Sequence, residues 1–240
     1  MKIVCSSDWH LDARTAGVER FDEIRESCEQ VVDYAIKASA DLFVFCGDLC
    51  DPEDGRDVLR ASAYAVGIAR RLSSVRIPSI WIAGNHDSVK DGETTTLEPL
   101  RYLCDDNIVV VSTGLHISTL GSRGEFMFLL LPYSPMPYDA CAAMRAAADD
   151  AVKSGQRFVV FSHLMLPGMH LGSESSEMAR GKDRNFPLEE MRAARPLLVV
   201  SGHYHRRQTT EDGIQVVGSL ARLTFGEESN TPQFLVIELA

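Results

Sequence analysis

At residues 2–11 the chain reads Lys-Ile-Val-Cys-Ser-Ser-Asp-Trp-His-Leu. Its first half is an apolar run that predicts a strand, and a polar motif follows directly. Apolar residues then recur at helical spacing over residues 24–36, which predicts an amphipathic helix. Apolar runs at residues 42–46 and 79–83 flank an alanine-rich helical pattern at residues 57–73. This alternation is typical of a β-α-β-α-β unit with a parallel sheet.

The rest of the chain continues the alternation. We expect strands at residues 108–111, 126–131, 158–161 and 197–200, a helix over residues 138–153, and a strand-and-turn meander at residues 214–217, 220–225 and 233–239. With 240 residues and 45% hydrophobic content, the chain can bury one large core. We find no repeat and no linker, so residues 1–240 are predicted to form a single domain.

Short polar motifs follow five of the predicted strands. They are Asp8-Trp9-His10, Gly47-Asp48, Gly84-Asn85-His86-Asp87, Ser162-His163 and Gly202-His203-Tyr204-His205. Open α/β sheets bind their ligands at the carboxyl ends of strands, so we expect these motifs to meet at one edge. Their carboxylate, imidazole and amide groups suit two divalent cations, such as manganese, iron, zinc or magnesium.

The spacing within the motifs supports a shared metal cluster. Asp8 and His10 are two residues apart, as are His203 and His205. In extended backbone each pair projects to one side. Asp48 follows a glycine, which allows a close approach of the backbone, so its carboxylate could bridge two cations.

The ordered set of motifs resembles the calcineurin-like metallophosphoesterase superfamily over essentially the whole chain. Within it, residues 7–11 are similar to the signature of the SbcD-type DNA double-strand-break repair exonucleases, and residues 202–208 and 218–227 resemble the closing motifs of that family. The resemblance implies an α/β fold, a four-layer α-β-β-α sandwich with mixed sheets. It also implies metal-dependent phosphodiester hydrolysis in DNA by an exonuclease.

The resemblance assigns roles to individual residues. One metal would be held by Asp8, His10, Asp48 and His205, and the other by Asp48, Asn85, His163 and His203. Both ions would be Mn²⁺, and a hydroxide between them would attack phosphorus. His86 would be the catalytic histidine that protonates the leaving oxygen. Asp87 would support it by orienting a histidine, or would only cap the following turn.

Basic residues near these motifs are candidates for substrate binding. Arg180, Lys182 and Arg184 lie in a stretch at residues 170–185 that is rich in glycine, serine and charge and has no period. A loop of this length in a compact domain is usually functional or mobile. Arg206 follows the last histidine pair, and all four residues could contact phosphates of the substrate. A solvated charged face is the alternative.

The net charge of −10 offers no general attraction to a nucleic-acid backbone. It suits the alternative function, a phosphodiesterase or phosphatase that acts on cyclic nucleotides or nucleotides. A binding protein that uses the fold without turnover is a third reading, and the complete ligand set argues against it.

The sequence also bears on location and partners. The apolar run at the N-terminus is too short for a signal peptide or a membrane span, and the six widely spaced cysteines fit reduced thiols, so we expect a cytoplasmic protein. SbcD-type proteins continue into a capping domain and a tail that binds an SbcC-type ATPase. This chain ends after the last core strand, so we expect neither segment. DNA is the expected partner, while the ATPase and a homodimer stay open.

Overall fold

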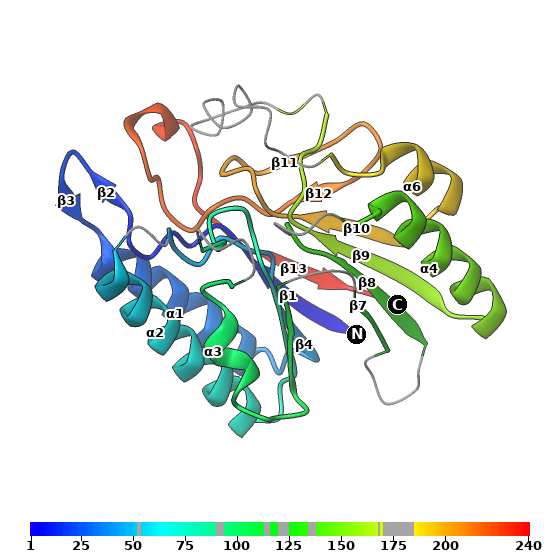
Figure 1. Cartoon of the computed structure of the whole chain (residues 1–240), viewed down its shortest axis with the longest axis horizontal. Coiled ribbons are helices and arrows are strands. Elements are labelled where there is room, and N and C mark those ends of the chain that lie inside the picture. The colour runs from blue at the N-terminus through cyan, green and yellow to red at the C-terminus, as the bar shows by residue number, and fades with distance from the viewer. Residues whose placement is uncertain are drawn as a thin grey trace.

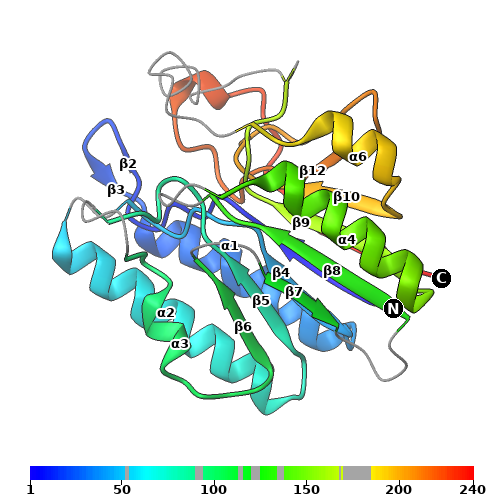
Figure 2. The ribbon, with the colours of Figure 1, turned by 45° about the vertical axis from the view of Figure 1, so that its right-hand side comes forward.

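The computed structural model describes residues 1–51, 54–89, 94–112, 116–119, 125–133, 138–167, 169 and 185–240. In these residues two β-sheets lie face to face, and helices cover the outer face of each sheet (Figure 1, Figure 2). The layers follow one another as helix, sheet, sheet and helix, which confirms the predicted α-β-β-α sandwich.

The first sheet has five strands, in the spatial order β13 (Leu235–Glu238), β1 (Lys2–Ser6), β4 (Leu42–Phe45), β5 (Ser79–Ile82) and β6 (Ile108–Val111). The helices of this half are α1 (Phe21–Lys37), α2 (Gly55–Ser74) and the short α3 (Glu98–Arg101). β1, β4, β5 and β6 are parallel, as the β-α-β-α-β pattern predicts. β13 pairs with β1 antiparallel, so the sheet is mixed.

The second sheet has six strands, in the spatial order β11 (Gln208–Thr209), β12 (Gln215–Val216), β10 (Leu198–Ser201), β9 (Arg157–Ser162), β8 (Phe126–Leu131) and β7 (His116–Thr119). Its outer helices are α4 (Ala140–Ser154) and α6 (Leu188–Ala194). Strands β8, β9, β10 and β12 are parallel, and the edge strands β7 and β11 are antiparallel to their neighbours. This sheet is therefore mixed as well.

Three apolar clusters hold the layers together. Strand residues that face the middle, such as Val44 and Phe161, form the cluster between the sheets. A second cluster joins the first sheet to α1 and α2, and a third joins the second sheet to α4 and α6. Strands in the middle are buried on both faces, which explains their continuous apolar runs in the sequence.

One predicted element is wrong. Residues 220–225 form no strand; the chain there is irregular and then enters the 3₁₀ turn η1 (Phe225–Glu227). The strands on either side of this segment, β12 and β13, belong to different sheets. The segment therefore connects the two sheets instead of continuing a meander.

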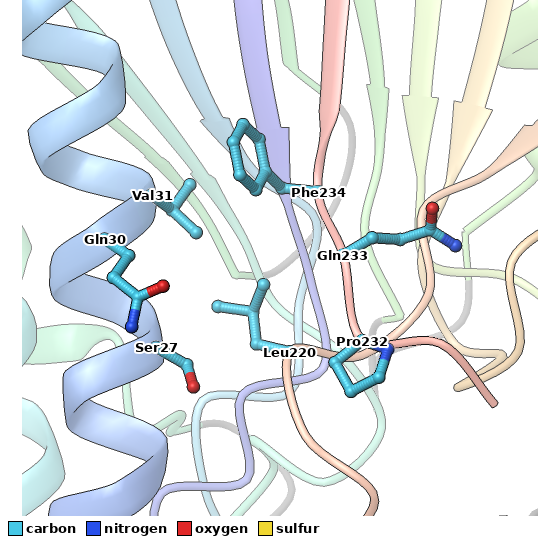
Figure 3. Close-up of a pocket in the computed structure, with 7 residues that line it drawn as sticks. All are labelled: Ser27, Gln30, Val31, Leu220, Pro232, Gln233 and Phe234. Carbon is cyan, nitrogen blue, oxygen red and sulfur yellow. The ribbon is translucent and has the colours of Figure 1, made fainter.

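A small hairpin and an open groove complete the first half. The hairpin consists of β2 (Arg14–Thr15) and β3 (Val18–Glu19) and precedes α1. The groove, of about 290 Å³, lies between α1 and the C-terminal segment (Figure 3). It is lined by Ser27, Gln30, Val31, Leu220, Pro232, Gln233 and Phe234. It contains no charged side chain and none of the predicted site residues.

Within the described ranges, no helix has both the length and the apolar character that a bilayer crossing requires.

Candidate metal centre

The turn after β1 carries Asp8 and His10 and packs against the turn after β4. The backbone N–H of Asp8 donates to the carbonyl of Gly47 at 2.8 Å, and the N–H of His10 donates to the carbonyl of Asp48 at 3.1 Å. β1 and β4 are adjacent parallel strands, so their carboxyl ends meet at one edge. All three candidate ligands in these turns are buried.

Three glycines let the ligand-bearing loops come this close. A Cβ atom at Gly84 would lie 2.0 Å from Oδ1 of Asp48, and one at Gly47 would lie 2.3 Å from Nδ1 of His163. At Gly202 a Cβ atom would lie 2.9 Å from the same Nδ1. Each of these distances is shorter than real Cβ contacts, so the cluster requires glycine at all three positions.

Four candidate ligands have a backbone conformation that residues other than glycine rarely adopt. The φ angles are 53° at Asp8, 43° at His10, 63° at Asp48 and 80° at His203. Such strain costs about 1–3 kcal/mol per residue and persists where the surrounding structure enforces it, commonly at functional sites. The backbone here is shaped to aim these side chains at one another.

The first of two ligand clusters joins the turn after β1 to the turn after β10. Ligand atoms of Asp8, His10 and His205 all lie within 4.8 Å of one another. The Nε2 atoms of His10 and His205 are 3.2 Å apart. Nδ1 of His205 is 2.9 Å from Oε1 of the buried Glu227. A carboxylate that accepts from Nδ1–H leaves Nε2 as the ligand atom, a pattern common around metal-binding histidines.

The second cluster contains Asp48, His163 and His203, whose ligand atoms also all lie within 4.8 Å of one another. Asn85 joins it, because its Oδ1 lies 3.1 Å from Nε2 of His163 and 3.0 Å from Nδ1 of His203. Nδ1 of His163 faces the carbonyl of Cys46, which again directs Nε2 into the cluster.

Asp48 lies between the two clusters. Its Oδ2 is 3.6 Å from Nε2 of His10 and 3.1 Å from Nε2 of His163. Burial alone would raise the pKa of Asp48, but the imidazoles of His163, His86 and His10 hold it well below its usual value. Conversely, burial would lower the pKa of His163, whereas Asp48 and Asp8 raise it to about 9. The carboxylate is therefore ionised and placed to bridge two cations.

The residues present fit a pair of divalent cations. Oδ2 of Asp8 is fully buried and has no hydrogen-bond partner among the described residues. An unpaired buried carboxylate oxygen is costly unless a cation neutralises it. Two buried carboxylates, an amide oxygen and four imidazoles in two adjoining groups are a donor set that suits manganese, iron or zinc.

His86 stands at the open side of this centre. Its side chain is 27% exposed, and its backbone N–H donates to Oδ1 of Asp48 at 2.9 Å. Its Nδ1 contacts Oδ1 of Asp51, whose other oxygen is 3.7 Å from Nδ1 of His10. Burial would raise the pKa of Asp51, but the hydrogen bonds from His10 and His86 hold it well below its usual value. One ionised carboxylate thus orients both imidazoles.

Asp87 ties two loops together. Its carboxylate accepts from the backbone N–H groups of Gly84 at 2.8 Å and of Asp48 and Leu49 at 2.9 Å each, and from the hydroxyl of Thr96. These partners differ from the histidine that the sequence analysis expects. Asp87 is placed to hold Asp48 in position, and a catalytic role for it stays a prediction.

The structure brings together all seven predicted metal ligands and His86. Arg206 is exposed next to His205. Arg180, Lys182 and Arg184 lie outside the described residues, so the prediction that they bind substrate stays a prediction.

Sequence reasoning placed Asp51 in a turn, where it could support a metal ligand, but did not identify its histidine partners, and it missed the role of Glu227. The three-residue spacing from Asp48 to Asp51 was the available signal for Asp51. Glu227 lies 22 residues after His205 in an irregular segment, and nothing in the local pattern points to their contact.

Alanine at position 84 is expected to destabilise the protein by about 1–3 kcal/mol, the usual cost of overpacking. The added Cβ would displace Asp48, so the variant should also lose affinity for Mn²⁺. Gly67 in α2 is the matched control, because a Cβ there meets nothing within 4 Å. Gly67→Ala should be neutral or stabilise by up to about 1 kcal/mol. Urea denaturation would measure the free energy of unfolding of both variants, and equal values would contradict the packing argument.

Glu227→Gln should weaken Mn²⁺ binding about 10- to 100-fold, the usual effect of losing a residue that orients a metal ligand. Glutamine keeps an oxygen opposite His205 but removes the charge that fixes its protonation. Titration calorimetry with Mn²⁺ would measure the change. The control variant Glu228→Gln changes an exposed neighbour and should bind Mn²⁺ as the wild type does. Identical affinities for both variants would leave Glu227 with only a packing role.

Comparison with families of known proteins gives one match over most of the chain. A family model described as "Calcineurin-like phosphoesterase" matches residues 1–207. The crystal structure of a dimetal phosphatase from Danio rerio has a TM-score of 0.57 and 14% identity, covering 90% of this chain and 86% of that one. This likeness shows a shared fold.

The relatives fall into two sets, which differ in the share of this chain that their similarity covers. A protein of Invertebrate iridescent virus 3, whose name places it among phosphoesterases, is 25% identical over 225 residues, which are 92% of this chain and 59% of that protein. The DNA double-strand break repair protein Mre11 of Saccharolobus solfataricus is 37% identical over 91 residues, which are 38% of this chain and 23% of that protein. The Mre11 protein of Aeropyrum pernix is 39% identical over 105 residues, 43% of this chain and 25% of that protein. The chain therefore spans little more than half of the first relative and about a quarter of the others.

Proposed function

This chain belongs to the calcineurin-like phosphoesterase family, and on that basis we propose that it hydrolyses phosphodiester bonds in DNA, as an exonuclease that uses Mn²⁺. The coarser assignment, a metallophosphoesterase with candidate ligands for two metal ions, follows from the family and the ligand clusters. The observation that carries the proposal is the bridging position of Asp48 beside His86. This arrangement can hold two cations and a proton donor around one phosphate.

The protein's own residues divide the chemistry between them. Two bound divalent ions would supply a nucleophile at neutral pH and stabilise the charge of the phosphate. Asp48 holds the two ligand clusters together. Asp51 contacts Nδ1 of His86, so Nε2 is the ring nitrogen that would carry the transferable proton. A proton on Nε2 can pass to the leaving oxygen when the phosphorus–oxygen bond breaks. The backbone N–H of His86, bound to Asp48, keeps the ring at a fixed position beside the metals.

DNA is proposed as the substrate because of the Mre11 relatives. The Mre11 relatives are 32–39% identical to this chain over 91–112 residues, against 25% for the viral phosphoesterase-type protein over 225 residues. The name of Mre11 refers to repair of DNA double-strand breaks, and the motifs quoted above resemble those of the SbcD-type repair exonucleases. A homodimer and an ATPase partner of the SbcC type are further proposals that rest on the same resemblance.

The second candidate is a phosphodiesterase or phosphatase for nucleotides, and the net charge of −10 favours it. A nuclease that neutralises several phosphates must lose affinity steeply as salt is added, whereas an enzyme for small esters should not. Salt dependence therefore separates the two candidates.

The test uses the whole chain with Mn²⁺. End-labelled single- and double-stranded DNA would be incubated beside cyclic nucleotides and bis(p-nitrophenyl) phosphate, with His86→Ala as the control. Shortened DNA products that disappear with the variant, and that decrease as NaCl rises from 50 to 200 mM, would support the nuclease. Turnover of only the small esters would overturn it and favour the second candidate.

A further inference from the structure

Phe225 is an exposed aromatic residue in the turn that also carries Glu227, the partner of His205. Its exposed fraction is 80%, among the highest of the large apolar residues in the described part of the chain. It begins η1, the orange-red turn at the upper edge of the molecule in Figure 1, close to the hairpin of β2 and β3. An aromatic side chain left in water at a site edge is a candidate contact for a ligand.

The turn that carries Phe225 is fastened on two sides. On one side the hydroxyl of Thr15 in the hairpin donates to the carbonyl of Leu223 at 2.7 Å, and the guanidinium of Arg20 donates to the carbonyl of Arg222. On the other side Oε2 of Glu227 accepts from the N–H of Leu223 at 2.7 Å. Phe225 is therefore presented by a fixed backbone, which lowers the entropy lost on binding.

The same turn is anchored to the metal centre. Glu227, which holds His205 at 2.9 Å, lies two residues after Phe225. Two residues span at most about 7 Å. The backbone of Phe225 therefore lies close to that of Glu227, whose carboxylate contacts His205.

Two exposed arginines lie on the same segments, and the guanidinium of one of them, Arg222, donates to the carbonyl of Asn230 at 2.8 Å. Arg206 directly follows His205, and Arg222 precedes Phe225 by three residues; both are exposed. Neither has a carboxylate within 4.0 Å among the described residues, whereas Arg14 of the hairpin is paired with Asp57, and Arg20, directly after the hairpin, is paired with Glu23. In a chain of net charge −10, arginines without a carboxylate partner beside an exposed ring match a nucleic-acid strand, whose phosphates need cations and whose bases need stacking partners.

We propose that Phe225 stacks on the base of an unpaired nucleotide next to the scissile phosphate, while Arg206 and Arg222 contact the neighbouring phosphates. This inference rests on the proposed action on DNA and adds that the strand enters the site single-stranded. Stacking on a side chain requires a base that has left the duplex. A duplex substrate would therefore be cut only where its end is unpaired.

The test measures binding and turnover separately. Oligonucleotides with 2-aminopurine at successive positions would be bound, with Mn²⁺, to the full chain carrying His86→Ala, which prevents cleavage. One position should show quenched fluorescence, and adding Phe225→Ala should remove the quenching. In the active protein, Phe225→Ala should raise KM for single-stranded DNA about 5- to 100-fold, the range for one lost stacking contact, and lower kcat much less. Phe225→Trp should restore both signals.

The control is Tyr102→Ala, which removes another exposed aromatic, 77% exposed, between α3 and the start of β6, at the amino-terminal edge of the parallel strands. It should change neither quenching nor KM. If wild-type protein cleaves DNA and Phe225→Ala matches it in KM and fluorescence, the inference is overturned and the proposed function stands. If Phe225→Ala instead lowers kcat and Mn²⁺ affinity together, its role is structural and the inference is again overturned. If wild-type protein does not act on DNA, the proposed function fails and the inference with it.

Discussion

Replacing Asp48 with Asn is expected to lower phosphodiester hydrolysis by about a thousandfold or more, since removing a single preorganised stabilising group already costs about 10²- to 10³-fold. The physical reason is the position of one carboxylate oxygen, 3.6 Å from Nε2 of His10 and 3.1 Å from Nε2 of His163. Asparagine keeps the shape but carries no charge, so it cannot bridge two cations. Both ligand clusters would lose their shared member.

Metal binding gives this prediction a second measurement. A cation that binds only the folded state raises stability according to its concentration and affinity. Mn²⁺ should therefore raise the melting temperature of the wild-type protein and have a much smaller effect on Asp48→Asn. Asp106→Asn, an exposed carboxylate just before β6, is the matched control and should behave as the wild type. Full activity together with an unchanged thermal shift in Asp48→Asn would exclude the bridging role.

Most of the fold could be predicted from the sequence because its strands are buried on both faces. Continuous apolar runs mark β4, β5 and β8, and glycine or proline marks where neighbouring segments end. The segment at residues 220–225 was predicted wrongly because Leu220, Ala221 and Leu223 pack into the apolar cluster of the first sheet and its helices without pairing to a strand. An apolar run alone does not distinguish these two situations. That residues 1–240 form one domain stays a prediction.

The candidate ligands could be predicted because each follows a strand, and strand ends of parallel sheets converge. Contacts that depend on turn geometry could not be predicted from the sequence. Asp51 reaches both His10 and His86 only because the turn after β4 folds beneath them. Glu227 meets His205 because residues 218–227 return from the second sheet toward the metal centre. Neither contact has a periodic pattern in the sequence, so each required the three-dimensional structure.

His86→Ala is expected to lower kcat for DNA about 10²- to 10⁴-fold, the usual contribution of a general acid, while Mn²⁺ affinity stays near that of the wild type. His86 contacts Asp51 through its side chain, and its backbone N–H, which alanine retains, donates to Asp48. The loss should depend on the leaving group. DNA expels a basic alkoxide that needs a proton, whereas p-nitrophenolate leaves without one. Hydrolysis of bis(p-nitrophenyl) phosphate should therefore fall much less than cleavage of DNA.

Asp51→Asn should reproduce part of this selectivity, because its carboxylate directs Nε2 of His86 toward the substrate by occupying Nδ1. We expect a loss of about 10- to 100-fold on DNA, in the range for residues that orient a catalytic or ligand histidine. The double variant, Asp51→Asn with His86→Ala, should be no slower than His86→Ala alone, since Asp51 acts through the ring that has been removed. Steady-state rates on both substrates measure this coupling. Losses that multiply in the double variant, or that are equal for DNA and the nitrophenyl ester, would show that Asp51 acts on the metal ligand His10 instead.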